Sequence, residues 1–373
     1  MADINQIITQ GIGTPSGISF YLLGGLGVSP IIPTPVIPEV FSASRIRLYN
    51  RAGSLIYEVS APSFREWILN DIGNAQFEVK AAGLEDYIEF GNYITIEHTK
   101  LDTWVGVIVP PRTWSPNRIT VNAKSAMWLF AQRVGSYTQD VVGSWGQVFT
   151  QVLGIVNSAE TTLLQMGTYD DGISYSSTVD MSNVHTYLQR ALAQAQTRLD
   201  FRPVVTNGKL TIYADMKPTL YTSSSLRLEE GLNIKDNASI LVNQGEIYND
   251  VTVLGVGLED SEKYTASASD AASIAKYGRR QILFSEGQSQ SDVDRLAIVR
   301  LAQYAYPRNT LALTAADVGS TLNEVRVGYS AEVLLRSVGY QSGTLGFGTT
   351  QYIRVVQYDD KTGEAALVCE EAE

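Results

Sequence analysis

The side chains that most often carry acid–base or metal chemistry are scarce in this sequence. It contains two histidines, His98 and His185, and one cysteine, Cys369. No HExxH, HxH or CxxC arrangement is present, so the spacing that zinc ligands need is missing. We therefore predict no metal site and no cofactor, and we expect both histidines at the surface or at an interface. A lone cysteine cannot form an internal disulfide, so Cys369 is expected to be a small apolar residue in the last strand.

A nucleophile or a converging pair of acids is equally hard to find. The string VGSWG at 142–146 lacks the GxSxG spacing of a nucleophile elbow and opens a helical pattern, so Ser144 is expected to cap that helix. YDDG at 169–172 lacks the ligand ladder of an EF-hand. Adjacent acids, expected in turns and at solvated edges, are Asp170–Asp171, Glu229–Glu230, Asp359–Asp360 and Glu370–Glu371. We predict no catalytic residue, and we do not expect an enzyme.

Tryptophan side chains could stack on sugars, which keeps a carbohydrate-active protein open as an alternative. The five are Trp67, Trp104, Trp114, Trp128 and Trp145. Four of them lie in apolar strand or helix patterns, which favours core packing.

Length, composition and charge limit the class of protein. A chain of 373 residues predicts two or three domains. Its 20 Tyr and 31 Gly, with many β-branched residues, favour strands joined by turns over helices. The net charge of −11 and the lack of a basic run argue against sequence-specific DNA binding. An acidic surface would suit either an ordinary soluble protein or a channel that DNA passes without sticking.

Residues 1–40 are predicted to form an extended N-terminal arm. The apolar stretch 16–37 is interrupted by glycines and prolines, and no Lys or Arg precedes Arg45. We therefore predict neither a membrane span nor an export signal. An apolar segment that cannot bury itself is expected to lie along a neighbouring subunit or over its own domain. The candidate subunit-contact residues are Tyr21, Leu22, Leu23 and Leu26.

The remaining chain is predicted to be mainly β with an α/β insertion. Short alternating runs over 41–125 predict a first small antiparallel β-barrel, with the turn NDIG at 70–73 between two strands. Helical spacing in SAMWLFAQRV, at Val148–Val156 and from Asn183 to Leu199, followed by a hairpin turn at Asn207–Gly208, predicts a small α/β domain at 126–225.

Strand patterns return over 226–373 and predict a second tube-like β-barrel. The polar stretch LEDSEKYTASASDAAS reads as a long loop, and a helix begins near Ser291 and ends before Pro307. We therefore expect an inserted loop and helix at about 258–307. The last hairpin turn is expected at DDKTG, residues 359–363.

The two strand-rich regions share a spacing that suggests an internal duplication. WVGVI begins at Trp104 and ITV at Ile119, and YIRVV begins at Tyr352 and LVC at Leu367, which is 15 residues in each case. Hairpins of this size are common, so coincidence remains an alternative. If the duplication is real, three chains supply six barrels, enough to stack on a six-fold ring.

The order of these pieces resembles the siphophage-type tail-hub proteins, which are related to the central baseplate hub of contractile-tail phages. The resemblance covers about 41–373. It rests on IRLYNRAGSLIYEV, FREWILNDIGNAQFEV, FGNYITIE, WVGVIV, ITVNAKSAMWLFAQRV, VHTYLQRALAQAQTRLDFRPVVTNGKLTIY, YNDVTVLG, SDVDRLAIVRLAQYAYP and DDKTGEAALV. The order of the pieces is more specific than any one of them.

This resemblance implies a homotrimer at the tail tip of a virion, assembled in the host cytoplasm. Its two barrels per chain would continue the six-fold tail tube and distal tail ring and adapt them to a three-fold tip. The implied partners are the tail tube and distal tail proteins, the tape-measure protein and a tip or central-fibre protein, with phage DNA passing through without sequence-specific binding. Some relatives carry a C-terminal lysin or fibre extension; this sequence stops just after its last strand, so lytic activity is not expected.

Two alternatives remain open. One is a carbohydrate-binding or cell-wall-degrading tail-tip protein. The other is a tail-tube subunit, which would have a single barrel.

Overall fold

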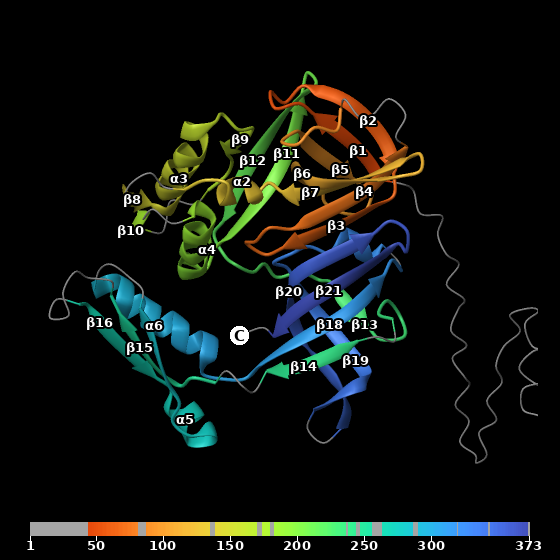
Figure 1. Cartoon of the computed structure of the whole chain (residues 1–373). Coiled ribbons are helices and arrows are strands. Elements are labelled where there is room, and N and C mark those ends of the chain that lie inside the picture. The colour runs from red at the N-terminus through yellow and green to blue at the C-terminus, as the bar shows by residue number, and fades with distance from the viewer. Residues whose placement is uncertain are drawn as a thin grey trace, which may run out of the picture. The chain divides into compact units, whose positions relative to one another are not determined.

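A computed structural model shows a protein built mostly from strands, in agreement with the predicted fold class. It describes residues 44–80, 87–134, 139–169, 174–179, 183–235, 238–243, 247–255, 263–285, 290–318, 320–341 and 344–371. All of these belong to one compact unit, Phe41–Glu373. Figure 1 shows two large groups of strands and two smaller groups that combine strands with helices.

The first β-module curls around one hydrophobic core. Its strands are β1 (Ser44–Tyr49), β2 (Leu55–Ala61), β3 (Ser63–Ile68), β4 (Asn74–Lys80), β5 (Tyr93–Glu97), β6 (Trp104–Ser115) and β7 (Arg118–Ser125). They lie in the order β3-β4-β7-β6-β5-β1-β2, and β2 also contacts β4. Ala75, Phe77 and Val79 alternate with exposed or half-buried neighbours, because successive strand side chains point to opposite faces of the sheet.

An α/β part follows the first module. Its elements are α2 (Trp128–Ala131), β8 (Gln139–Ser144), α3 (Trp145–Ala159), β9 (Leu164–Met166), β10 (Ser174–Val179), α4 (Val184–Ala195), β11 (Arg198–Thr206) and β12 (Lys209–Lys217). β11, β12 and β9 form one sheet, and β8 pairs with β10. Trp145, Phe149 and Leu188 join the core between the helices and this sheet.

The second β-module has its own core. Its elements are β13 (Arg227–Glu229), β14 (Ser239–Asn243), β18 (Arg308–Ala316), the short 3-10 helix η1 (Thr321–Asn323), β19 (Ser330–Gln341), β20 (Thr344–Asp359) and β21 (Glu364–Glu371). β20 also pairs antiparallel with β3, so both modules share one thirteen-stranded sheet. Figure 1 shows β3 alongside the strands of the second module.

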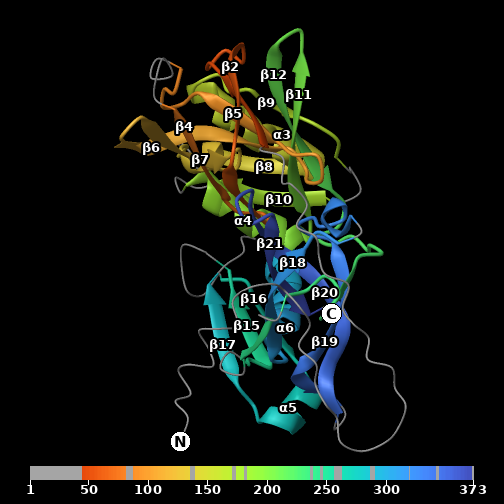
Figure 2. The ribbon, with the colours of Figure 1, turned by 90° about the vertical axis from the view of Figure 1, so that its right-hand side faces the viewer.

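An inserted unit lies between β14 and β18 in the sequence. It contains β15 (Asp250–Leu254), β16 (Thr265–Ser269), α5 (Ala271–Tyr277), β17 (Gln281–Ser285) and α6 (Gln290–Tyr304). β16-β15-β17 is a separate sheet, and α6 lies against it (Figure 2). Val251 and Val253 of β15 share a hydrophobic core with Val293 and Leu296 of α6.

The long loop expected within this insertion is wrong, because residues 265–277 form β16 and the helix α5. In β16, Ala266 and Ala268 face the small core between serines and threonines. Alternating Ala and Ser gives too little contrast in hydrophobicity to reveal a strand. β15 was assigned to the second barrel from its sequence, and it belongs instead to the sheet of the inserted unit.

The two β-modules repeat one strand arrangement. The order β3-β4-β7-β6-β5 recurs as β14-β18-β21-β20-β19, and every neighbouring pair is antiparallel in both. The strands also follow one another along the chain in the same sequence. The inserted unit occupies the place that the turn at Asn70–Gly73 holds in the first module.

The pairing registers of the two modules also match. When the hairpins β6–β7 and β20–β21 are aligned at their turns, β7 corresponds to the whole of β21. Asn74–Lys80 of β4 then correspond to Thr310–Ala316 of β18. The buried positions agree, since Ile119, Val121 and Ala123 correspond to Ala365, Leu367 and Cys369. The pairing also shifts register in both long strands, between Val109 and Thr113 in β6 and between Ile353 and Val355 in β20, although the shift in β6 lies nearer to the hairpin turn. Five strands with the same neighbours and the same buried face therefore occur twice.

The 15-residue spacing in the sequence points to the right hairpins but aligns them wrongly. Ile119 corresponds to Ala365 and not to Leu367, so that alignment is off by two residues. The turn between β20 and β21 is longer than the turn between β6 and β7. The same spacing of 15 residues therefore connects different positions in the two hairpins.

Several local predictions are confirmed. Asn207 and Gly208, with φ of 53° and 74°, form the turn between β11 and β12. Asn70, with φ of 54°, lies in the turn between β3 and β4. Ser144 caps α3 and Asn183 caps α4 through their side-chain oxygens. The helix expected in SAMWLFAQRV is much shorter, because β7 continues to Ser125 and uses the start of the run.

One hydrophobic cluster combines Tyr49, Tyr93 and Val105 of the first module with residues of the α/β part. We propose 41–125, 126–225 and 226–373 as the domains, with the inserted unit inside the last.

Candidate functional site

A buried ion pair joins the two β-modules where β3 meets β20. The side chains of Arg65 and Asp360 are 0% and 2% exposed, and Arg65 Nη2 lies 3.1 Å from Asp360 Oδ1. Asp360 also accepts hydrogen bonds from the Ser44 hydroxyl, at 3.0 Å, and from the backbone amide and hydroxyl of Ser63, at 2.9 Å each. A buried charge is tolerated when its partner and hydrogen-bond donors are in place, as they are here. Asp360 is therefore no solvated turn residue, contrary to the expectation for the adjacent acids.

Further polar contacts tie the modules together around this pair. Gln357 Nε2 donates to Glu66 Oε1 at 2.7 Å, and Lys100 forms an ion pair with Asp317. Leu101, from the loop after β5, is buried in the core of the second module. The junction is thus a continuous interface of backbone pairing, charge and apolar packing.

His98 lies in this junction and not on the outer surface. Its Nε2 is 3.4 Å from the Tyr358 hydroxyl, and burial, with a further contribution from Asp360, raises the pKa of Tyr358 to about 12. Burial lowers the pKa of His98 below 6.5, and the nearby cations Arg65 and Lys100 lower it further, while Asp360 and Asp317 oppose them. His98 is therefore neutral in the folded protein at neutral pH.

Acidifying the protein from about pH 7 to about pH 5 should lower its melting temperature. The unfolded state binds protons more readily than the folded state once the pH falls through the ordinary histidine pKa, so stability is lost in that direction. His98→Gln should make the melting temperature less dependent on pH over this range, as differential scanning fluorimetry would measure. Some dependence should remain, because burial also lowers the pKa of His185. An unchanged pH profile in the variant would contradict the assignment.

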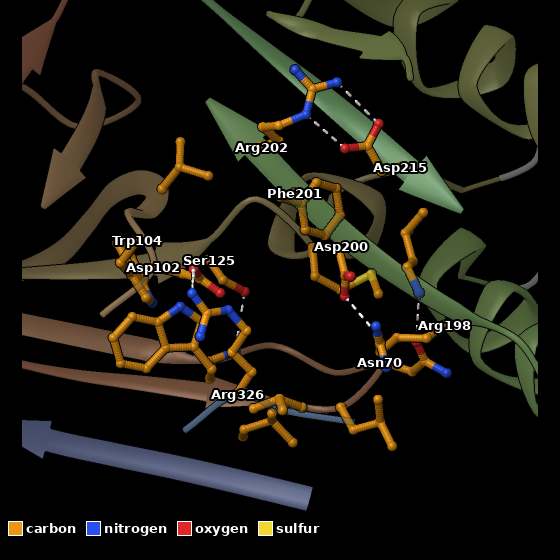
Figure 3. Close-up of a pocket in the computed structure, with 18 of the residues that line it drawn as sticks. Asn70, Asp102, Trp104, Ser125, Arg198, Asp200, Phe201, Arg202, Asp215 and Arg326 are labelled. Atoms are coloured by element: carbon orange, nitrogen blue, oxygen red, sulfur yellow. Dashed lines mark hydrogen bonds and ion pairs between the residues drawn. The ribbon is translucent and has the colours of Figure 1, made fainter. Parts of the chain in front are cut away.

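A cavity of about 410 Å³ lies where the first module, the α/β part and the second module meet. Figure 3 shows its lining, with Trp104 from β6, Phe201 from β11 and Arg326 from the segment before β19. Asn70 anchors one wall: its amide donates to the Thr197 carbonyl at 2.8 Å, and its side-chain oxygen accepts from the Leu199 amide at 3.0 Å. The NDIG turn therefore docks the first module on the start of β11.

Oppositely charged side chains in this cavity are paired with one another. Arg198 lies 3.0 Å from Asp200, Arg202 lies 2.8 Å from Asp215, and Arg326 lies 3.0 Å from Asp102 (Figure 3). The hydroxyl of Ser125 accepts from the Gly73 amide. Neither histidine nor cysteine appears among the described lining residues. The Arg326–Asp102 pair joins the second module to the first, whereas the other two pairs lie within the sheet of β11 and β12. None of these contacts brings a nucleophile to a base.

Among the strand edges without a described partner are those of β14 and of the end of β6. In the described structure β14 forms strand pairs only with β18, although it also comes close to β19, so its other edge has no described pairing partner. β6 pairs with β5 only from Trp104 to Val107, so the same edge of its later residues has no described partner. Trp114 lies on this open stretch and is 54% exposed. Open edges and an exposed tryptophan are typical of protein–protein contact surfaces.

The candidate contact residues Tyr21, Leu22, Leu23 and Leu26 lie outside the described residues, as do Asp170 and Asp171. Cys369 is confirmed as a buried strand residue, and burial raises its pKa to about 12. Trp104 and Trp145 are 1% exposed. Among the described side chains, no group of three or more His, Cys, Asp or Glu is placed to hold a metal ion. No helix of the described chain has the length and apolarity to cross a bilayer.

The sequence did not reveal the open edge of β6, although a signal was present. Pro110 and Pro111 interrupt an otherwise apolar strand, and proline within a strand pattern indicates an edge, because it has no N–H for a neighbour.

No protein-family model matches the sequence, and no curated protein matches it. Solved structures of similar fold include prophage tail protein gp18 from Listeria monocytogenes EGD-e, with a TM-score of 0.60 and 10% identity over 88% of this chain and 95% of that one. The 43 kDa tail protein of prophage MuSo2 from Shewanella oneidensis gives 0.58 and 15%, over 89% and 98%. A tail protein from Neisseria meningitidis MC58 gives 0.56 and 10%, over 88% and 97%. The chain therefore has the fold of phage tail proteins, as the resemblance in its sequence implied.

Proposed function

We propose that this chain is a structural hub of a phage tail, located at the tail tip of the virion and assembled in the host cytoplasm. The observation that carries the proposal is the repeated β-module. Three copies of a chain with two such modules present six similar units around one axis, while the α/β part and the inserted unit occur three times. A homotrimer of this kind adapts a six-fold tube and distal tail ring to a three-fold tip.

The composition and the paired charges agree with a role in assembly and not in catalysis. The net charge of −11 would let DNA pass a lumen without adhering to its wall. Asp200 and Asp215 in the cavity are held by arginines, and so is Asp360 in the buried module junction. The proposed partners are the tail tube and distal tail proteins, the tape-measure protein and a tip or fibre protein.

The mass of the purified chain in solution tests the trimer. Native mass spectrometry should give a species of three times the 40.8 kDa chain, and a virion map should place it at the end of the tail tube. A chain that stays monomeric at high concentration and is absent from the tail tip would contradict the hub. A tail-tube subunit, the rival with a single module, would be spread along the whole tail.

Removing residues 2–40 tests the proposed role of the arm. If Tyr21, Leu22, Leu23 and Leu26 bury against a neighbouring subunit, the truncated chain should form trimers less readily and fail to complete tails. Trimers and tail assembly that survive the deletion would remove the arm from the proposal and leave the repeated modules as its basis.

The exposed Trp114 favours a carbohydrate-binding alternative, since an indole ring can stack on a sugar. A glycan array and a cell-wall zymogram with the purified chain would separate the two functions. We expect both to be negative for the hub.

A further inference from the structure

The junction inside the chain shows how one β-module pairs with another. The last five residues of β20, Val355–Asp359, pair antiparallel with Phe64–Ile68 of β3. β19 pairs with the earlier part of β20 and leaves this stretch of the edge open for β3. β3 uses its other edge to pair with β4. One module thus contributes the end of a long strand, and the other contributes an edge strand.

Each module also contains one strand that corresponds to a strand of this junction but does not take part in it. The counterpart of β20 in the first module is β6, whose stretch Pro111–Ser115 precedes the hairpin turn and lacks a described partner on the β5 side. The counterpart of β3 in the second module is β14, whose edge away from β18 is likewise open in the described structure. A chain therefore uses one of each kind of edge internally and leaves one of each kind free.

The matched registers show which residues of β6 and β14 correspond to the residues that pair in the internal junction. The alignment of β7 with β21 fixes the alignment of β4 with β18, and this in turn fixes the alignment of β3 with β14. Phe64–Ile68 then correspond to Ser239–Asn243, which is the whole of β14. The same alignment places Gln357–Asp359 on Thr113–Ser115, next to the hairpin turn, whereas the irregularity in β6 places Val109 on Val355. The internal pairs Asp359 with Phe64 and Tyr358 with Arg65 then correspond to Ser115 with Ser239 and Trp114 with Ile240.

We propose that β6 of one copy pairs antiparallel with β14 of the next, in the register that sets Ser115 opposite Ser239. The contact is heterologous, because each copy presents two different edges, and such contacts close into rings when the rotation permits. It rests on the proposed hub, since it names the surface through which the copies join, and it extends the thirteen-stranded sheet from copy to copy.

The chemistry of both edges fits this pairing. β14 has the sequence SILVN, without a charge or a proline to block an incoming strand. On β6, Pro111 would lie at the end of the ladder, where its missing N–H costs least. Trp114 is 54% exposed on the open stretch, and a neighbouring β14 would cover it. An aromatic side chain that becomes buried in an interface is a common energetic anchor.

Engineered cysteines test the pairing in the full chain. Directly opposed positions in antiparallel strands have Cβ atoms about 4.5–5.5 Å apart, close to the span of a disulfide. Ser115 and Ser239 are both exposed, so S115C/S239C should fold normally. Under mild oxidation it should give cross-linked multimers on non-reducing gels, ending in a closed ring, while either single variant should give none. The native Cys369 is buried and should not react.

A register control makes the test specific. S115C/I240C shifts one position, which directs the two side chains to opposite faces of the sheet, and it should cross-link much less. Trimers by native mass without cross-links, or equal cross-linking in the shifted variant, would overturn the pairing and leave the hub standing. Cross-links in a ring of another size would keep the pairing and overturn the trimer; a monomer without cross-links would overturn both.

Discussion

Asp360→Ala should lower the free energy of unfolding by about 3–5 kcal/mol, because it leaves a fully buried guanidinium without its counter-charge. Arg65 is 0% exposed, and Asp360 is its carboxylate partner in the structure. The substitution also removes the acceptor of three hydrogen bonds from Ser44 and Ser63, whose donors would stay buried. Urea denaturation of the purified chain, followed by tryptophan fluorescence, would measure the loss.

Two further variants make this result specific. Lys361→Ala changes an exposed side chain in the same turn and should alter stability by less than about 0.5 kcal/mol. The double variant R65A/D360A should cost less than the sum of the two single variants, since residues in one network are coupled. Additive single effects, or a D360A variant as stable as the parent, would show that the pair does not join the modules.

The strands were predictable because their burial is one-sided. In β4 and β7, apolar side chains at every second position give the alternation that a half-buried strand requires. The turn at Asn207–Gly208 was predictable for a different reason: both residues tolerate the positive φ that a two-residue hairpin needs. Local patterns of this kind depend on neighbours in the sequence, and they revealed most of the elements.

The site depends on residues that are far apart in the chain, which local patterns cannot pair. Arg65 and Asp360 are separated by 295 residues, and an adjacent Asp–Asp in a turn gives no sign that one carboxylate is buried. The repeat of the two modules is likewise a property of pairing partners. Corresponding strands such as NAQFEVK and TLALTAA share a buried face and almost no residues, so registers reveal the duplication and sequence similarity does not.

The duplication also explains why the chain leaves edges open. A β-module of this type has one long strand end and one edge strand to pair. Joining two modules within a chain uses one of each, so a monomer always retains the other two. An isolated chain therefore exposes Trp114 and one edge of β14, and the proposed pairing between copies would cover both.

A second large effect is expected at Arg198, which fixes the α/β part to the second module. Arg198 Nε bonds Asp200 Oδ1 at 3.0 Å, and its Nη1 donates to the carbonyl oxygens of Gly328, at 3.0 Å, and Leu220, at 3.3 Å. The guanidinium lies 5.2 Å from the ring centre of Tyr329, and the side chain is 2% exposed. One side chain thus meets a carboxylate, two carbonyls and an aromatic ring across the cavity.

Arg198→Ala should therefore cost about 3–5 kcal/mol in the free energy of unfolding, because these partners lose a donor that water replaces only in part. Arg118→Ala is the matched control: Arg118 is 64% exposed in its ion pair with Glu78, and its loss should cost less than about 1 kcal/mol. None of the Arg198 contacts involves β6 or β14, so the disulfide between positions 115 and 239 should still form in the R198A background. Loss of that cross-link together with stability would mean that the α/β part, and not the strand edges alone, positions one copy against the next.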